Sequence, residues 1–117
     1  MLIPMLQAKL HRATVTATLI NYEGSLSVDT DLIAAVGMRL YQQIQIYDIT
    51  NGARFETYLI PGKPGSGEMC VNGAAARLVM PGDRIIVAAY VQCTPDEADQ
   101  LVPKVALLDD LNRIITV

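Results

Sequence analysis

The chain has 117 residues, enough to bury one hydrophobic core and too few for two ordinary domains, so a single domain over residues 1–117 is expected. Nine basic and twelve acidic residues give a net charge of −3 without a Lys/Arg-rich run, which excludes a typical nucleic-acid-binding protein. The longest apolar runs hold about seven residues, far below the roughly 20 that cross a bilayer.

Two alternating segments occupy the start of the chain. From Ala8 to Ile20, small or apolar residues alternate with arginine and threonine, which predicts a half-buried strand. A polar, glycine-containing break follows at residues 21–25, and the alternation resumes over residues 26–28. We therefore expect two strands separated by a turn.

A short helix and a third strand are expected next. Asp29 can accept a hydrogen bond from the first helical turn and predicts a helix from Thr30 to Val36, which Gly37 is suited to end. From Gln43 to Tyr47, isoleucine alternates with glutamine in the pattern of a strand.

A hairpin is predicted around Asn51-Gly52, because this dipeptide between two strand-like runs favours a tight turn in which both residues have positive φ. The second run, from Phe55 to Ile60, is rich in aromatic and β-branched residues. Pro61 to Gly67 contains three glycines and two prolines and is expected to be a mobile loop.

The remaining predicted elements are a helical turn, a long strand, a capped helix and two edge segments. Thr94 and Pro95 begin the capped helix, because threonine is a good N-cap and proline suits the first helical position. The others are Ala74 to Val79 (helical turn), Arg84 to Cys93 (apolar strand), and Lys104 to Leu108 and Arg113 to Val117 (edges). Many short strands with few helical residues predict a mainly β fold closed as a small barrel.

Motifs for common cofactors are missing. Cys70 and Cys93 form no CxxC pair and lie far from the single histidine, His11, so no metal site or disulfide framework is expected, and both are interpreted as reduced, packed thiols. The apolar N-terminus has no basic leader, so a cytoplasmic protein without a membrane partner is expected. The hydrophobic content of 51% indicates apolar surface between subunits, with a well-filled core as the alternative.

Four short stretches of sequence make this interpretation more specific. They are Lys9-Leu10-His11-Arg12; Tyr22-Glu23-Gly24-Ser25; Thr50-Asn51-Gly52 with Arg54, Thr57 and Tyr58; and Val71-Asn72-Gly73-Ala74-Ala75-Ala76. In this order and spacing, from about Met5 to Val91, the chain resembles the pyruvoyl-dependent aspartate 1-decarboxylase family of bacteria. The resemblance implies a six-stranded double-psi β-barrel with short helices, assembled as a homotetramer with active sites between neighbouring subunits.

The resemblance also implies the reaction, in which L-aspartate loses its α-carboxylate to give β-alanine for pantothenate and coenzyme A biosynthesis. No ordinary side chain offers a ketone, so a decarboxylase without pyridoxal phosphate or a metal needs another electrophile. In this family that electrophile is a pyruvoyl group, here derived from Ser25, which would form a Schiff base with the substrate amine.

The pyruvoyl group would arise by autocatalytic cleavage at Gly24-Ser25. Glycine tolerates the strained backbone that brings the serine hydroxyl onto the preceding carbonyl, so an N→O acyl shift, β-elimination and hydrolysis can follow. The products would be a β chain of residues 1–24 and an α chain of residues 25–117. The residues leave open whether maturation is autonomous or needs an accessory maturation factor.

Further roles are implied residue by residue. Thr57 would position the carbonyl before Ser25, Arg54 would bind a substrate carboxylate with its fork of donors, and Tyr58 would donate a proton to the carbanionic intermediate. Thr57 is also expected to bind substrate. The other expected substrate-binding residues line the pocket (Asn72, Gly73, Ala74, Ala75), lie at its positively charged mouth (Lys9, His11), form an aromatic wall (Tyr47) or lie beside the scissile bond (Tyr22). Tyr47 stands where several relatives carry tryptophan.

Two other interpretations stay open at this point. A cleavage-incompetent relative would keep the barrel as a structural or binding subunit, although the intact set of Gly24, Ser25, Arg54, Thr57 and Tyr58 argues against it. An N-terminal-nucleophile hydrolase would instead retain the amine of Ser25 and use it as a base. The strictness for aspartate over glutamate also stays open, and the resemblance becomes loose after Thr94.

Overall fold

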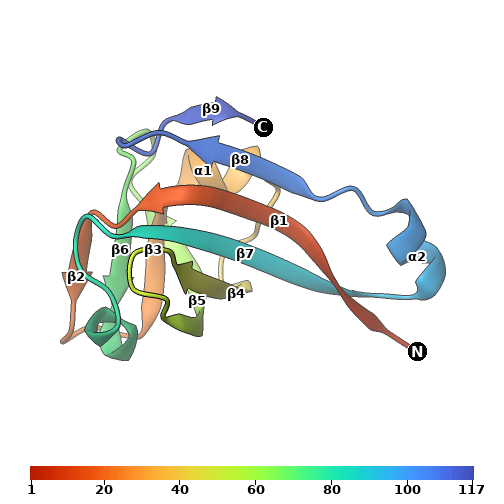
Figure 1. Cartoon of the computed structure of the whole chain (residues 1–117), viewed down its shortest axis with the longest axis horizontal. Coiled ribbons are helices and arrows are strands. Elements are labelled where there is room, and N and C mark those ends of the chain that lie inside the picture. The colour runs from red at the N-terminus through yellow and green to blue at the C-terminus, as the bar shows by residue number, and fades with distance from the viewer.

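The computed structural model describes residues 1–117 and contains nine β-strands, two short α-helices and one 3-10 helix (Figure 1). The strands are β1 Ile3–Thr14, β2 Ala17–Leu19, β3 Ser25–Asp29, β4 Gln43–Asp48, β5 Arg54–Gly62, β6 Met69–Asn72, β7 Arg84–Cys93, β8 Lys104–Leu108 and β9 Ile114–Thr116. The helices are α1 Thr30–Ala35, the 3-10 helix η1 Gly73–Arg77, and α2 Pro95–Gln100. The predicted mainly β fold with short helices is confirmed. No helix has the length and apolar character needed to cross a membrane.

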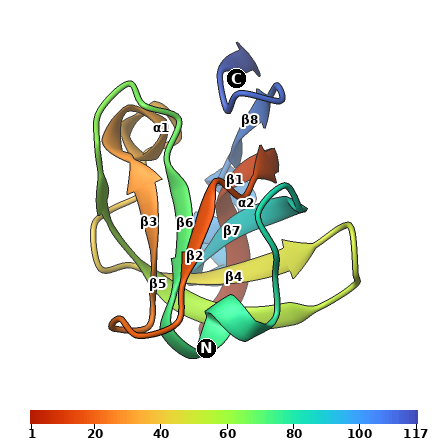
Figure 2. The ribbon, with the colours of Figure 1, turned by 90° about the vertical axis from the view of Figure 1, so that its left-hand side faces the viewer.

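The strands form one hydrogen-bonded sheet that curls around its core. Their order is β2-β6-β3-β5-β4-β7-β1-β8-β9, so β2 and β1 are far apart in the sheet although only Val15 and Thr16 separate them in the chain. Because this link is short, the sheet curls until β2 and β6 lie beside β1 and β7, as Figure 2 shows. Backbone hydrogen bonds of 2.9 Å, from Val15 N to Asp83 O and from Thr16 N to Met69 O, hold the link.

The predicted six-stranded double-psi barrel is not confirmed in that form, because the hydrogen-bonded order is open and has nine strands. A break separates β2 from β1, and β8 and β9 extend the sheet beyond β1. β8 pairs in parallel with β1 and antiparallel with β9. The predicted edge segment from Lys104 to Leu108 is therefore not an edge, because a strand lies on each side of it. The other predicted edge segment, around β9, does lie at an edge of the sheet.

A cluster of 21 buried hydrophobic residues fills the curled sheet. Alternate residues of the central strands point into it, including Leu10, Ile46 and Val87, each 0% exposed. Leu32 and Ile33 of α1 extend the cluster. Burying one such side chain stabilises a fold by about 1.5–3 kcal/mol, so this cluster is the main source of stability. β7 has the bounds predicted for the long apolar strand, and both cysteines are free and buried, as expected.

The prediction of one strand from Ala8 to Ile20 is wrong, because β1 and β2 are separate strands with different partners. Arg12 has a φ of 63°, and the pairing of β1 with β7 shifts register between Leu10 and Ala13. This irregularity lets Leu10 and Ala13 both be buried although they are three residues apart. The simple alternation therefore ends here, and Leu19 is 51% exposed.

Both predicted helix starts are confirmed. The Asp29 side chain accepts a hydrogen bond from Asp31 N at 2.8 Å, and α1 ends one residue earlier than predicted, before Gly37 with its φ of 72°. Thr94 and Glu97 form a reciprocal capping box at the start of α2. Such caps are visible in a sequence because they join residues only two or three positions apart.

The predicted hairpin of β4 and β5 is confirmed, but its turn is longer than the two-residue type. Asp48 N donates to Ala53 O at 2.8 Å, so the turn proper lies between these residues. Gly52 has the expected positive φ, at 82°, whereas Asn51 has no positive φ, so the prediction is confirmed for Gly52 and wrong for Asn51. The Asn51 side chain instead donates to Leu78 O at 2.8 Å and fastens the turn to the segment after η1.

The mobile loop expected from Pro61 to Gly67 is a shorter, hydrogen-bonded turn, since β5 continues to Gly62. The carboxylate of Asp29 accepts hydrogen bonds from Gly65 N and Gly67 N, both at 2.9 Å. Burial alone raises the pKa of Asp29, but backbone N–H groups, led by that of Gly67, hold it below the usual value. The ionised N-cap of α1 therefore also holds this turn.

Candidate active site

Ser25 begins β3 with its side chain fully enclosed. It is 0% exposed, and its Oγ donates to Glu23 O at 3.1 Å. Asn72 Nδ2 donates to the same Oγ at 3.1 Å. Antiparallel pairing of β3 with β6 sets Ser25 opposite Asn72, so the register of two buried strands fixes the hydroxyl.

The amide of Asn72 has all its hydrogen-bonding groups in use. Its Nδ2 also donates to Ser27 Oγ at 3.0 Å, and its Oδ1 accepts from the thiol of Cys70 at 3.2 Å. Burial, and then the charge of Glu68, raises the pKa of Cys70, so the thiol stays protonated and able to donate. We call this group the serine cluster: Glu23, Ser25, Ser27, Cys70 and Asn72.

Gly73 supports the backbone that precedes Ser25. Its φ is 75°, and a Cβ on it would lie 2.6 Å from Gly24 Cα and 3.0 Å from Tyr22 O. Gly24 itself has no positive φ, and a Cβ on it would meet no atom within 4 Å, so glycine is not sterically required there in the uncut chain. The steric need for glycine lies instead at Gly73, where η1 begins one residue earlier than the predicted helical turn from Ala74.

Two of the predicted site residues, Thr57 and Tyr58, lie on β5, the strand that pairs in parallel with β3. Parallel pairing sets Leu59 opposite Leu26, so Tyr58 lies level with Ser25 along the neighbouring strand. Thr57 and Tyr58 are both half-buried. Thr57 is not a hydrogen-bonding partner of Ser25, whose hydroxyl is bonded within the serine cluster.

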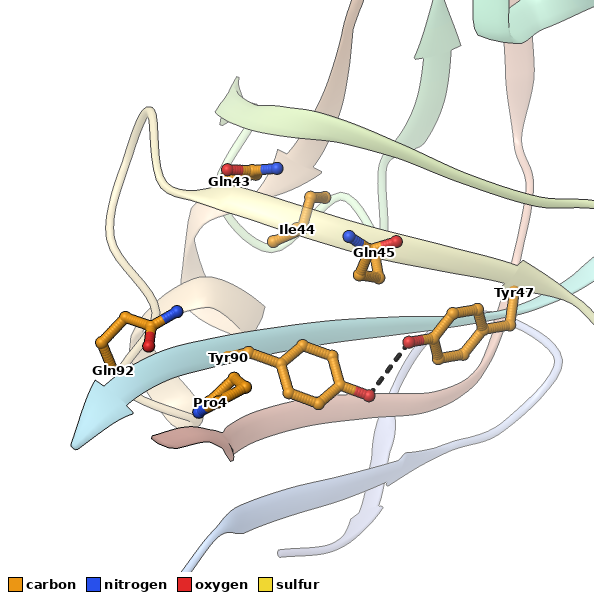
Figure 3. Close-up of a pocket in the computed structure, with 7 residues that line it drawn as sticks. All are labelled: Pro4, Gln43, Ile44, Gln45, Tyr47, Tyr90 and Gln92. Atoms are coloured by element: carbon orange, nitrogen blue, oxygen red, sulfur yellow. Dashed lines mark hydrogen bonds between the residues drawn. The ribbon is translucent and has the colours of Figure 1, made fainter. Parts of the chain in front are cut away.

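A second group of predicted residues lies on the outer surface of the sheet. The guanidinium carbon of Arg54 is 3.9 Å from the centroid of the Tyr47 ring. The hydroxyls of Tyr47 and Tyr90 are hydrogen-bonded at 2.9 Å (Figure 3). Burial, and then the bond to Tyr90, raises the pKa of Tyr47, so its phenol stays protonated. We call this group the arginine cluster: Tyr47, Arg54 and Tyr90.

An open cavity of about 400 Å³ adjoins the arginine cluster. Its lining consists of Pro4, Gln43, Ile44, Gln45, Tyr47, Tyr90 and Gln92 (Figure 3). Three amides and two phenols give it a wall that can donate and accept hydrogen bonds. No residue of the serine cluster lines this cavity.

Lys9 and His11 lie two residues apart on β1. Lys9 pairs with Ala88 of β7, and Ala88 pairs with Gln45 of β4, so Lys9 shares a row of the sheet with the cavity wall. Burial, then the charges of Lys9 and Arg12, lowers the pKa of His11, so its imidazole is neutral at pH 7. The positive charge expected at the mouth of the site would therefore come from Lys9, and His11 Nδ1 is buried without a partner.

The remaining predicted residues border the serine cluster. Ala74 is exposed and Ala75 is packed against the core, both in η1 directly after Gly73. Tyr22 is 56% exposed, and its carbonyl faces Gly73. By contrast, the only stacking contact of Arg54 is with Tyr47, and no ion pair links it to the serine cluster. Within one chain, the predicted residues therefore form two separate groups.

Three residues of these clusters are not predicted from the sequence: Ser27, Cys70 and Tyr90. Ser27 and Cys70 are polar positions inside buried strands, and Tyr90 is the one phenol in the apolar run of β7. These signals are weak, because each becomes meaningful only when its partner strand is known. No three His, Cys, Asp or Glu side chains lie together in a group that could hold a metal ion.

Comparison with known proteins points to one family. The family model described as aspartate decarboxylase matches residues 1–115. Aspartate 1-decarboxylase of Bacillus velezensis is 54% identical over 110 residues, which are 94% of this chain and 87% of that protein. Those of Clostridium beijerinckii and Desulfotalea psychrophila are 52% and 53% identical over 114 residues, 97% of this chain and 92% and 96% of theirs. The similarity thus continues past Thr94, where the sequence alone suggests only a loose resemblance.

Proposed function

This chain belongs to the aspartate decarboxylase family, and we propose that it performs its reaction with a ketone made from its own Ser25. As a carboxy-lyase it converts L-aspartate to β-alanine and carbon dioxide, a step of pantothenate biosynthesis. One observation carries the proposal: the enclosed Ser25 hydroxyl, held between the Glu23 carbonyl and the Asn72 amide.

Self-cleavage would start at Ser25 Oγ. Oγ adds to the carbonyl carbon of Gly24, the peptide C–N bond between Gly24 and Ser25 breaks, and the freed amine takes the hydroxyl proton, which leaves an ester. Loss of the proton on Ser25 Cα then expels the carboxylate of Gly24. Water replaces the nitrogen of the resulting dehydroalanine and releases ammonia. The β chain would hold residues 1–24 and the α chain residues 25–117.

The surroundings of Ser25 suit this chemistry and the pyruvoyl group that results. The side chain is 0% exposed, which limits premature hydrolysis of the ester, and Asn72 offers a fixed N–H donor to an oxygen at residue 25. Once formed, the group supplies a ketone that accepts the substrate amine and takes up the electron pair released with carbon dioxide. Neither a metal ion nor pyridoxal phosphate takes part in this proposal.

Substrate binding and proton transfer are assigned to other residues. Arg54 is exposed and has no ion pair in the chain, so its fork of donors is free for a carboxylate of aspartate. Tyr58, level with Ser25 on β5, would deliver the proton to the carbon that loses carbon dioxide. Thr57 would guide cleavage, and Lys9 would attract the dicarboxylate.

We also propose a homotetramer of cleaved chains in which neighbouring subunits complete each active site. The separation of Arg54 from the serine cluster within one chain supports this assembly. Apolar side chains beside the hairpin turn and η1 provide contact surface, since Ile49, Leu78 and Met80 are 44%, 44% and 70% exposed. A cytoplasmic location follows from the biosynthetic role proposed.

The double-psi barrel is proposed for the curled part of the sheet. If β1 and β2 count as one bent strand, the run from β2 through β6, β3, β5, β4 and β7 to β1 returns to its own start and contains six strands. β8 and β9 would then be additions outside the barrel.

The intact mass of the purified protein, measured under denaturing conditions, tests the proposal. Two fragments that meet at Gly24 and Ser25 are expected, and the larger one should be lighter by one ammonia than the fragment that simple hydrolysis of the Gly24-Ser25 bond would give. Such a sample should then release carbon dioxide from L-aspartate. A larger fragment that keeps its amine would indicate an N-terminal-nucleophile hydrolase instead. A chain that stays uncut alone but is cut in a cell extract would indicate an accessory maturation factor.

A further inference from the structure

Tyr90 makes a contact that the proposed function does not use. Its hydroxyl is 2.9 Å from that of Tyr47, and the Tyr47 ring in turn lies under Arg54, with 3.9 Å between the guanidinium carbon and the ring centroid. The three side chains come from three strands, β7, β4 and β5. They form a chain of contacts that ends at the proposed substrate arginine.

The register of the sheet explains why the two phenols meet. Gln45 pairs with Ala88 and Tyr47 with Ile86, so Tyr47 and Tyr90 lie two positions to either side of the Gln45–Ala88 pair. Residues two positions apart on a strand share a face, which puts both rings on the outer surface. Ala88 has only a methyl side chain and leaves room for the rings to reach one another, as Figure 3 shows for Tyr47 and Tyr90.

We propose that Tyr90 is a positioning residue. It holds the Tyr47 ring in place and thereby fixes how far the guanidinium of Arg54 extends toward the substrate carboxylate. The assignment rests on the role of Arg54 in the proposed function. The same restraint affects substrate selectivity, because a guanidinium held in one position distinguishes aspartate from glutamate, which is longer by one methylene.

The open cavity beside the rings explains why the hydrogen bond between the two hydroxyls is needed to hold the Tyr47 ring. Tyr47 and Tyr90 both line this space of about 400 Å³, so one side of the Tyr47 ring is not held by packed side chains. Without the bond, the ring is free to move into the cavity and take the guanidinium with it. A cation over an aromatic face is held only while the ring keeps its orientation.

The neighbouring carboxylate does not compete for Arg54. Glu56 lies two residues along β5 on the same face, but its Oε2 accepts hydrogen bonds from Gln43 Nε2 at 2.8 Å and from Gln45 Nε2 at 3.0 Å. These two amides hold the carboxylate over β4. The chain therefore leaves the guanidinium of Arg54 supported from below by Tyr47 and free for an incoming carboxylate.

Steady-state kinetics of Tyr90→Phe provide the first test. The variant should be cleaved as completely as the wild type and keep its kcat within about twofold, while KM for aspartate rises about fivefold, the effect of losing one hydrogen bond. Succinate, which is aspartate without its amine, serves as a substrate analogue: it should bind more weakly by a similar factor, and any preference over the longer glutarate should shrink. Tyr41→Phe is the matched control, because Tyr41 is 71% exposed and its hydroxyl forms no hydrogen bond.

A double variant tests whether the two hydroxyls act as one unit. Tyr47→Phe retains an aromatic ring at position 47 but removes the other partner of the bond, so it should match Tyr90→Phe. The combination of both should be no worse than either, because the same bond is already lost. Effects that multiply, or a Tyr90→Phe enzyme with the wild-type KM and the wild-type preference for succinate, would overturn the proposal.

Nuclear magnetic resonance separates this proposal from the proposed function. Protons above an aromatic ring are shielded, so the guanidinium Nε–H signal of Arg54 should move toward that of a free arginine in Tyr90→Phe and stay in place in Tyr41→Phe. An unmoved signal overturns the role of Tyr90 whether or not the chain decarboxylates aspartate. If wild-type protein is neither cut nor active even in a cell extract, the proposed function fails, and the Arg54 signal still decides whether Tyr90 holds the arginine.

Discussion

The buried side chains of the serine cluster (Ser25, Ser27, Cys70 and Asn72) lie on the paired strands β3 and β6, whereas the arginine cluster lies on the outer surface formed by β4, β5 and β7. Ser25 and Asn72 are 0% and 1% exposed, while Tyr90 is 42% exposed and borders an open cavity. A chain that cuts itself needs only its own residues and protection from water. Binding a diffusing substrate requires an accessible surface.

The two clusters therefore differ in what a substitution should change. A lost partner in the serine cluster leaves a buried polar group unsatisfied, at a cost of about 1–3 kcal/mol. The same loss in the arginine cluster should cost little stability, because water can bind the exposed polar group that is left behind. Changes to the serine cluster should thus act on maturation, and changes to the arginine cluster on substrate affinity.

Replacing the hydroxyl itself has the largest expected effect. Ser25→Ala removes the nucleophile, so the chain should remain uncut and release no carbon dioxide from aspartate. Denaturing mass spectrometry and a carbon dioxide assay check this outcome. Ser27→Ala is the control, because it removes a neighbouring hydroxyl on the same amide but keeps the nucleophile, so it should still be cleaved, although more slowly than the wild type. Normal turnover by Ser25→Ala would contradict the pyruvoyl mechanism.

Gly73→Ala should come next. The new Cβ would lie 2.6 Å from Gly24 Cα, and positive φ alone costs a residue other than glycine about 1–2 kcal/mol. Cleavage should slow by at least about tenfold and Tm should fall. Gly24→Ala should keep Tm near the wild-type value, because a Cβ there meets no atom within 4 Å. Equal Tm values for the two variants would show that Gly73 does not support the backbone before Ser25.

Arg54→Ala should separate the clusters most clearly. The variant should mature normally, since Arg54 makes no contact with the serine cluster. Its KM for aspartate should rise about 10–100-fold, as expected for losing hydrogen bonds to a charged group worth about 1.5–3 kcal/mol. Arg39→Ala, at another exposed arginine, should keep the wild-type KM. Impaired cleavage in Arg54→Ala would mean that the clusters are coupled.

Cys70→Ala should have a smaller effect on the rate of cleavage. It leaves Asn72 Oδ1 without its thiol donor, at about 1 kcal/mol, so cleavage should slow about fivefold. Cys70→Ser keeps a donor and should restore most of the rate. The measurement is the uncut fraction at timed intervals after purification. If serine and alanine behave alike, the donor does not orient the amide.

The smallest effect expected is the pH dependence from His11. Its pKa is lowered in the folded chain, mainly by burial, so the unfolded chain binds more protons near the unperturbed value of about 6.5. The contribution of neutral His11 to the free energy of unfolding should therefore be fully present above about pH 6.5. It should be lost progressively as the pH decreases through that value. Tm measured between pH 5.5 and 7.5, roughly spanning this pKa, checks the slope. His11→Gln should flatten it, since the chain has no other histidine.

Much of the candidate site is apparent from the four local blocks of sequence. Gly24, Ser25, Arg54, Tyr58 and Asn72 stand where the family resemblance implies, although their roles remain predictions. The roles of Ser27, Cys70 and Tyr90 are not apparent, because each depends on a contact with another strand. The lowered pKa of His11 and the close approach of Gly73 to Gly24 are also not apparent, since they depend on burial and local backbone geometry.

Short-range patterns were sufficient for the caps at Asp29 and Thr94, the hairpin of β4 and β5, and the long strand β7, because each signal joins residues a few positions apart. Tertiary packing alone established the bond between Ser25 and Asn72, 47 positions apart, and that between Tyr47 and Tyr90, 43 positions apart. It also set Gly73 against Gly24. Such contacts depend on the order and register of strands, which are chosen by burial of the whole core and not by any local run of residues.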